Sequence, residues 1–101
     1  MTDTVLTERL AEQVLHWVVA TDRFLTGNRT WLKKWKFNPC QRIADAFRLL
    51  DAAAPTRYTI SLSRGRFEVE VEIQGRVGRA SGDSKARSIA LAVSRSLGLE
   101  V

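Results

Sequence analysis

Residues 58–73, YTISLSRGRFEVEVEI, decide the fold class, because apolar and polar side chains alternate on both sides of a turn sequence. Arg64-Gly65 fits a two-residue β-hairpin turn, in which glycine supplies the left-handed conformation. A turn at this place pairs apolar residues on one face: Leu62 with Phe67, Ile60 with Val69, and Tyr58 with Val71. A slip of one residue would break all three pairs. The stretch therefore predicts an antiparallel hairpin of fixed register.

Helical periodicity precedes the hairpin in two places. Residues 1–20 are predicted to form a helix whose apolar side chains share one face: Leu6, Leu10, Val14, Trp17 and Val18. A second helix is predicted to begin at Asn38, which can cap it, with Pro39 at its first position and Gln41 completing a capping box. Its apolar stripe ends before Pro55 and comprises Ile43, Phe47, Leu50 and Ala54.

A third strand and a last helix are predicted after the hairpin. Gln74-Gly75 is a turn signal ahead of a short strand over residues 76–80, in which Gly78 suggests a β-bulge. The last helix is predicted to begin near Asp83 or Ser84 and to stop at Gly98. Its expected buried residues are Ala86, Ile89, Ala90, Val93 and Leu97.

Together these patterns predict an α+β fold in a single domain of residues 1–101, in the order α-α-β-β-β-α. The domain divides into a helix over residues 1–20, a basic and aromatic loop over residues 21–37, and an α-β-β-β-α core over residues 38–101. We expect the inner face of the three-stranded antiparallel sheet to pack on the helices, against Ile43 and Phe47 of one and Ile89 and Val93 of the other.

The net charge of +5 is unevenly distributed along the chain. Residues 23–37 hold five basic residues and no acid; removing these five from the 16 basic residues leaves 11, which equals the number of acids. The excess positive charge therefore falls in the predicted loop. Such a local charge gives information about the partner, which would be anionic, and little about the fold. With one cysteine, no export signal and no apolar run of about 18–20 residues, we expect a cytoplasmic protein without membrane contact.

No residue pattern indicates catalysis. The sequence has no phosphate-binding glycine loop and no metal-ligand spacing, so we expect neither enzyme activity nor a cofactor nor a metal. His16 is interpreted as a surface histidine and Cys40 as a buried thiol. The stripe of Glu68, Glu70 and Glu72 is interpreted as the solvated face of the sheet.

The stretch GNRTWLKKWKF, residues 27–37, is the candidate site. Its partner-binding residues are expected to be Arg29, Trp31, Lys33, Lys34, Trp35 and Lys36. Cations beside aromatic rings can hold phosphates while bases stack, or can engage an acidic protein surface. At least one tryptophan is expected to anchor the loop to the core. Lys85 and Arg87, at the start of the last helix, form a secondary candidate for binding an anion.

Two family resemblances follow from these residues. The whole chain is similar to the phage ABA sandwich domain, through Trp17, Phe37, Pro39, the run from Ile43 to Phe47, and Asp83-Ser84. That resemblance implies the predicted fold and a phage or prophage setting in a bacterial host cell. From residue 38 onward the order of elements also resembles a double-stranded-RNA-binding domain, with Lys85 and Arg87 at its basic cluster.

Three functions remain open from the sequence. The first is a phage-encoded module that inhibits a host factor, such as a defence-system component, by covering an acidic or nucleic-acid-binding surface. The second is a module that binds nucleic acid, or a nucleotide such as an anionic signal molecule. The third is a virion or assembly component. Each would be non-enzymatic, and the oligomeric state is left open.

Overall fold

The computed structural model describes residues 2–99 and confirms the α+β class. Three α-helices are present: α1 (Asp3–Gln13), α2 (Ile43–Ala53) and α3 (Lys85–Ser96). The predicted sheet consists of β4 (Arg57–Ser63), β5 (Arg66–Ile73) and β6 (Arg76–Gly82). A second antiparallel sheet, which the sequence patterns did not predict, consists of β1 (Val18–Val19), β2 (Arg23–Leu25) and β3 (Trp31–Lys33), followed by a short 3-10 helix, η1 (Lys34–Lys36).

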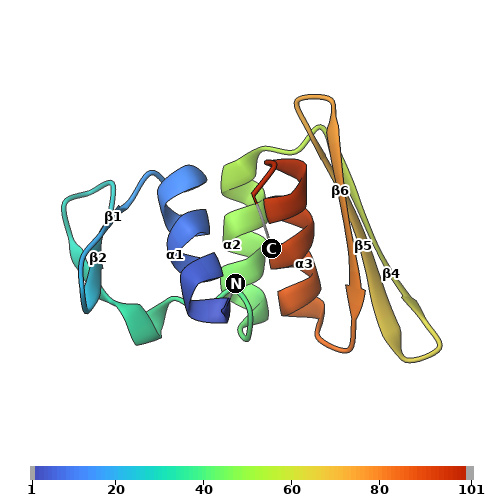
Figure 1. Cartoon of the computed structure of the whole chain (residues 1–101), viewed down its shortest axis with the longest axis horizontal. Coiled ribbons are helices and arrows are strands. Elements are labelled where there is room, and N and C mark those ends of the chain that lie inside the picture. Colours follow the sequence, from blue (N-terminus) through green and yellow to red (C-terminus); the bar gives the residue numbers. More distant parts are fainter. Residues whose placement is uncertain (1, 100–101) are drawn as a thin grey trace.

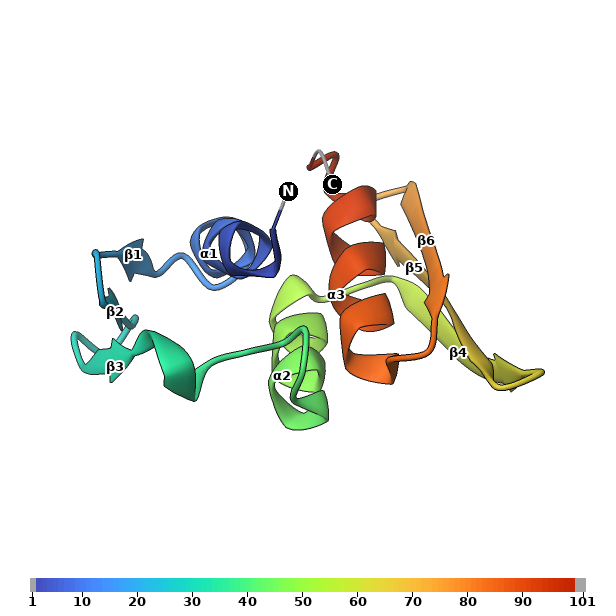
Figure 2. The same cartoon turned by 60° about the horizontal axis from the view of Figure 1, so that its bottom comes forward.

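The elements succeed one another along the long axis of the molecule. Figure 1 shows the small sheet at one end, then α1, α2 and α3, and the large sheet at the other end. The dimensions of 40 × 27 × 22 Å reflect this order. Figure 2 shows that α3 lies between the large sheet and the other two helices, so both of its sides are covered. It is therefore the element that joins the two halves of the core.

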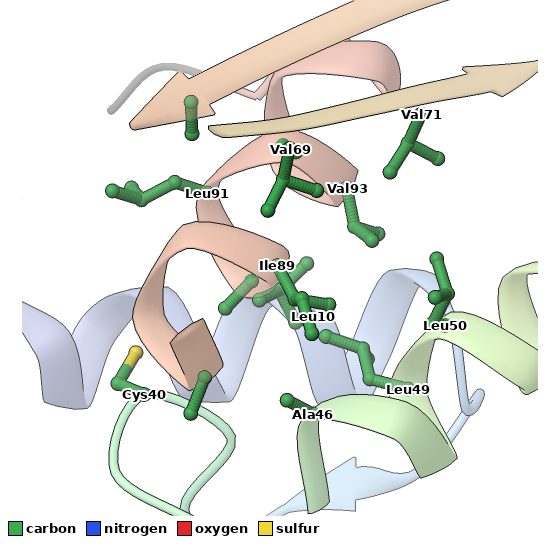
Figure 3. Close-up of a cluster of buried hydrophobic side chains, with 14 of the residues drawn as sticks. Leu10, Cys40, Ala46, Leu49, Leu50, Val69, Val71, Ile89, Leu91 and Val93 are labelled. Carbon is green, nitrogen blue, oxygen red and sulfur yellow. The ribbon is translucent and has the colours of Figure 1, made fainter. Parts of the chain in front are cut away.

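The predicted hairpin register is confirmed. Ile60 pairs with Val69, and the two flanking apolar pairs fall as expected, with strand order β4-β5-β6. Arg64 and Gly65 both have positive φ, 54° and 75°, as a type I′ turn requires. The apolar face of β5 packs on α3 around Val69 and Val71, as Figure 3 shows, and Ile89 and Val93 are fully buried there.

Gly78 does not form the predicted bulge; it pairs regularly with Val71. Its role is close packing, because a Cβ atom built at this position would lie 2.1 Å from the backbone oxygen of Ala92 and 2.3 Å from the nitrogen of Ser96. Only glycine allows α3 to approach the sheet so closely. Ser88, one helical turn before Ala92, extends this contact, since a Cβ atom built at Gly82 would lie 3.5 Å from its hydroxyl oxygen.

The expected packing of the sheet on α2 is wrong in part. Ile43 is exposed, Phe47 is half-buried, and the residues that α2 buries are Ala46, Leu49 and Leu50. A helix is about 10 Å wide and strands are spaced about 4.8 Å apart, so α3 alone covers only two strands. On the sheet its contacts are mainly with β5 and β6, and β4 lies at the margin, where Ile60 packs on the edge of the core.

Two helix boundaries also differ from the predictions. The first helix ends at Gln13, after which His16, with a φ of 57°, turns the chain and the N–H of Trp17 donates to the carbonyl of Ala11. The second helix begins at Ile43, because Asn38 uses its carbonyl to accept bonds from the N–H groups of residues 41 and 42 in a separate turn. The capping signal at Asn38 therefore belongs to a turn ahead of the helix.

Candidate partner-binding site

A cluster of aromatic residues holds the small sheet against α1. The ring centroids of Trp17, Phe24 and Phe37 lie 5.1–6.0 Å apart, and all three side chains are buried. In the sheet Phe24 pairs with Val19 and Leu32, which pack on the same cluster. Strands of two and three residues have few hydrogen bonds of their own, so these aromatic contacts supply the stability of the small sheet.

The opposite side of the small sheet faces outward. Val18, Leu25 and Trp31 form one row across its three strands, and Arg23 and Lys33 pair in the next row on that side. Val18 is 60% exposed and Trp31 is 52% exposed. The guanidinium carbon of Arg23 lies 4.8 Å from the Trp31 ring centroid. We call these five residues the outer meander face; it combines an apolar row, exposed at Val18 and Trp31, with two cations.

Trp35 and Lys34 lie elsewhere, on η1 beside α1. The Lys34 ammonium is 2.6 Å from a carboxylate oxygen of Glu8, and both side chains are mostly buried. Trp35 is 64% exposed, and the Lys36 ammonium lies 5.4 Å from its ring centroid. Trp35 lines a cleft of about 310 Å³ between η1 and the first half of α1. The predicted site residues are thus divided between two surfaces.

The expectation that Trp31 or Trp35 anchors the segment to the core is wrong, because both are exposed. Trp17, Phe24 and Phe37 anchor it instead. The expectation of a loop over residues 21–37 is also wrong, since this segment holds β2, β3 and η1. Sequence reasoning overlooked Val18, Arg23 and Leu25 as surface neighbours of Trp31. The alternation Arg23-Phe24-Leu25 was the available signal, but it spans only three residues.

Two acidic residues from outside residues 23–37, the basic segment, neutralise part of the charge of that segment. Asp22 lies 3.3 Å from Arg23, and Glu8 pairs with Lys34. Within residues 2–99, no ion pair involves the remaining cations, Arg29, Lys33 and Lys36, which we call the three unpaired cations. All three are exposed, and Arg29 lies in the β2–β3 turn with a φ of 60°.

Contacts within the fold engage both residues of the secondary candidate. Ser84 caps α3 by accepting a bond from the N–H of Arg87. The Arg87 side chain lies 3.2 Å from Asp3, which ties the start of α3 to the start of α1. The Lys85 ammonium lies 5.5 Å from the Phe47 ring centroid. These contacts give Lys85 and Arg87 a structural role that competes with anion binding.

The structure places His16, Cys40 and the glutamate stripe of β5 as the sequence predicts. His16 is exposed in the turn after α1. Cys40 is buried, and burial, assisted by the charge of Asp3, raises the pKa of its thiol. Glu70 and Glu72 on the outer side of the large sheet pair with Arg79 and Arg57, at 2.8 and 3.2 Å.

No group of three or more potential metal ligands is found in residues 2–99. Nor does this part of the chain contain a helix of the length and apolar character needed to cross a membrane.

Comparison with known proteins supports the fold. A phage protein from Bacillus cereus ATCC 14579, known from its crystal structure, superposes with a TM-score of 0.83. The match covers 100% of this chain and 92% of the other at 14% sequence identity, so the two share a fold. No protein-family model matches the sequence, and no curated protein matches it. The likeness to the phage ABA sandwich domain therefore stays a resemblance.

Proposed function

We propose that this chain is a non-enzymatic phage or prophage protein that binds a host protein in the bacterial cytoplasm and inhibits it. The fold it shares with a Bacillus cereus phage protein supports the phage setting. A target in a host defence system is the most specific form of the proposal, and it rests on that setting alone. The outer meander face is the proposed contact surface.

One observation carries the binding role: the row of Val18, Leu25 and Trp31, exposed at both ends, lies on a sheet whose other side is fixed by buried aromatic residues. A rigid, exposed tryptophan next to aliphatic residues is typical of the centre of a protein interface, because it buries much area at little entropic cost. Arg23 and Lys33 beside the row would face acidic residues of the partner. The surface thus fits a partner with an apolar hollow and an acidic border.

The test is capture of a partner from bacterial lysate by the tagged protein, with and without nuclease. We expect Trp31→Ala to weaken binding by about 2 kcal/mol or more, which is roughly 30-fold. Trp35→Ala, on the other surface, should bind as the wild type does. Arg66→Glu, an exposed charge reversal on the large sheet, controls for a general effect of charge. Equal capture by the wild type and the Trp31→Ala variant would refute the proposed surface.

Binding of nucleic acid or a nucleotide is the second candidate. The cations near Trp31 and Trp35 favour it, because such pairs can hold a phosphate beside a stacked base. Salt separates the candidates: on duplex DNA, the logarithm of affinity falls by about 0.9 per phosphate contact for each tenfold rise in salt. An interface centred on Trp31 should depend on salt far less. Loss of the captured partner on nuclease treatment would favour this second function.

A further inference from the structure

The strand β4 has a free edge and an exposed apolar side. It is an edge strand in the order β4-β5-β6, and in Figure 1 it lies on the side of the large sheet away from the helices. Its side chains on the α3 side of the sheet are Tyr58, Ile60 and Leu62, of which Tyr58 is 46% exposed and Leu62 63% exposed. Two large apolar side chains thus extend the core face of the sheet past the helix that covers it.

The hairpin register fixes which backbone groups of this edge are free. In a two-residue hairpin, the residues flanking the turn exchange hydrogen bonds, and alternate residues then do the same. Residues 57, 59, 61 and 63 therefore bond to β5. The N–H and C=O groups of Tyr58, Ile60 and Leu62 point away from the sheet, and no further strand pairs with them in the described structure.

The opposite edge of the same sheet is covered at one point. By the same alternation Arg79 on β6 points its backbone groups outward. Its carbonyl accepts a hydrogen bond of 2.6 Å from the guanidinium of Arg95 on α3. Natural sheets protect exposed edges with charges, prolines or covering elements, since a free edge pairs readily with another strand. Residues 58–63 of β4 contain no charge and no proline.

We propose that β4 pairs antiparallel with β4 of a second copy of this chain, about a two-fold axis at Ile60. In this register Ile60 meets Ile60 of the other copy, and the numbers of paired residues sum to 120. Tyr58 then meets Leu62, and Thr59 meets Ser61, so aromatic faces aliphatic and hydroxyl faces hydroxyl. The strand is therefore complementary to itself.

Charge is also compatible with this pairing. The register places Arg57 opposite Ser63 and Arg64 opposite Thr56, so no two like charges face each other directly. Arg57 is in addition paired with Glu72 of its own chain. A contact of one strand pair and its side chains is small compared with the roughly 1,200–2,000 Å² of stable interfaces, so the dimer should dissociate on dilution.

Sedimentation of the full chain over a range of concentrations tests the dimer. We expect the wild type to reach twice the monomer mass, and the double variant Tyr58→Lys/Leu62→Lys to stay monomeric because lysines then face each other in two pairs. Both positions are exposed, so its melting temperature should remain near that of the wild type. Val77→Lys, at an exposed apolar residue on the other face of the sheet, should still dimerise.

A charge exchange and a cross-link test the register. Tyr58→Glu/Leu62→Glu should also be monomeric, yet an equal mixture with the lysine double variant should form the dimer. Under oxidation Ile60→Cys should cross-link, since residues that exchange hydrogen bonds across antiparallel strands have Cα atoms about 5.5 Å apart, within disulfide reach. Ser61→Cys should cross-link poorly, and the buried Cys40 should not react.

Three results would overturn the proposal. The first is a wild type that stays monomeric at every attainable concentration. The second is a dimer that persists in the lysine double variant. The third is equal cross-linking of Ile60→Cys and Ser61→Cys, which would mean an association without the inferred register.

Discussion

Replacing Gly78 with alanine should separate α3 from the large sheet. The added Cβ would lie 2.1 Å from the backbone oxygen of Ala92, about 1.3 Å closer than the 3.4 Å at which ordinary contact begins. The oxygen belongs to the backbone and the position of a Cβ is fixed by the backbone, so neither atom can rotate away, and the helix must retreat by about that distance. The retreat would also loosen contacts between the fully buried Ile89 and Val93 and the strands.

The expected cost follows from overpacking. Extra methyl groups in a packed core cost about 1–3 kcal/mol, and a clash between two backbones belongs at the upper end. A loss of about 3 kcal/mol lowers the melting temperature of a domain this small by roughly 12–24 °C. Thermal unfolding followed by circular dichroism measures this shift.

Gly27→Ala is the matched control. A Cβ at Gly27 meets nothing within 4 Å, so the same change of residue should alter stability by no more than about 0.5 kcal/mol. If the two alanine variants melt within a few degrees of each other, the close approach of α3 to β6 does not limit stability and the reasoning is refuted.

Three further outcomes are expected. Phe24→Ala should cost about 3–5 kcal/mol, measured by urea unfolding, because the ring is fully buried in the aromatic cluster; a variant as stable as the wild type would contradict this. The Cys40 thiol should react slowly with iodoacetamide until the protein unfolds. Because folding raises its pKa, its contribution to stability should be complete below the ordinary pKa of a cysteine and be lost as the pH rises through the raised pKa; rapid labelling of the folded protein would contradict its burial. Reversing the three unpaired cations should leave the melting temperature nearly unchanged, whereas Lys34→Glu should lower it by placing a carboxylate beside Glu8; equal melting of the two variants would contradict the pair.

Sequence patterns were sufficient for the hairpin and for α3. Alternation over residues 58–73 sets which side chains face the core, and the two-residue turn at Arg64-Gly65 then leaves one register. The last helix had both a polar cap, Ser84, and a stop, Gly98, at the expected places. Long periodic segments with matching turn or cap signals leave few alternatives.

The small sheet could not be predicted in the same way. Its strands have two or three residues, which is too short for alternation to show, and its stability comes from Trp17, Phe24 and Phe37, far apart in the sequence. For the same reason the tryptophans were misjudged. Trp31 and Trp35 are large aromatic residues of the kind that usually packs in a core, but the core next to the small sheet consists of Trp17, Phe24 and Phe37 instead.

The position of α3, between the large sheet and the other two helices, should determine the order of folding. Helices α1 and α2 precede it in the chain, as does the whole of the large sheet, and they are joined mainly through it. The hairpin strands can pair early, because their contacts are local, but their apolar face has no cover until residues 85–96 arrive. Closing the core then requires α2 and α3 to meet across the intervening strands, a non-local step that slows folding. The transition state should therefore contain α3, and newly made chains lacking it would expose an apolar sheet to chaperones and proteases.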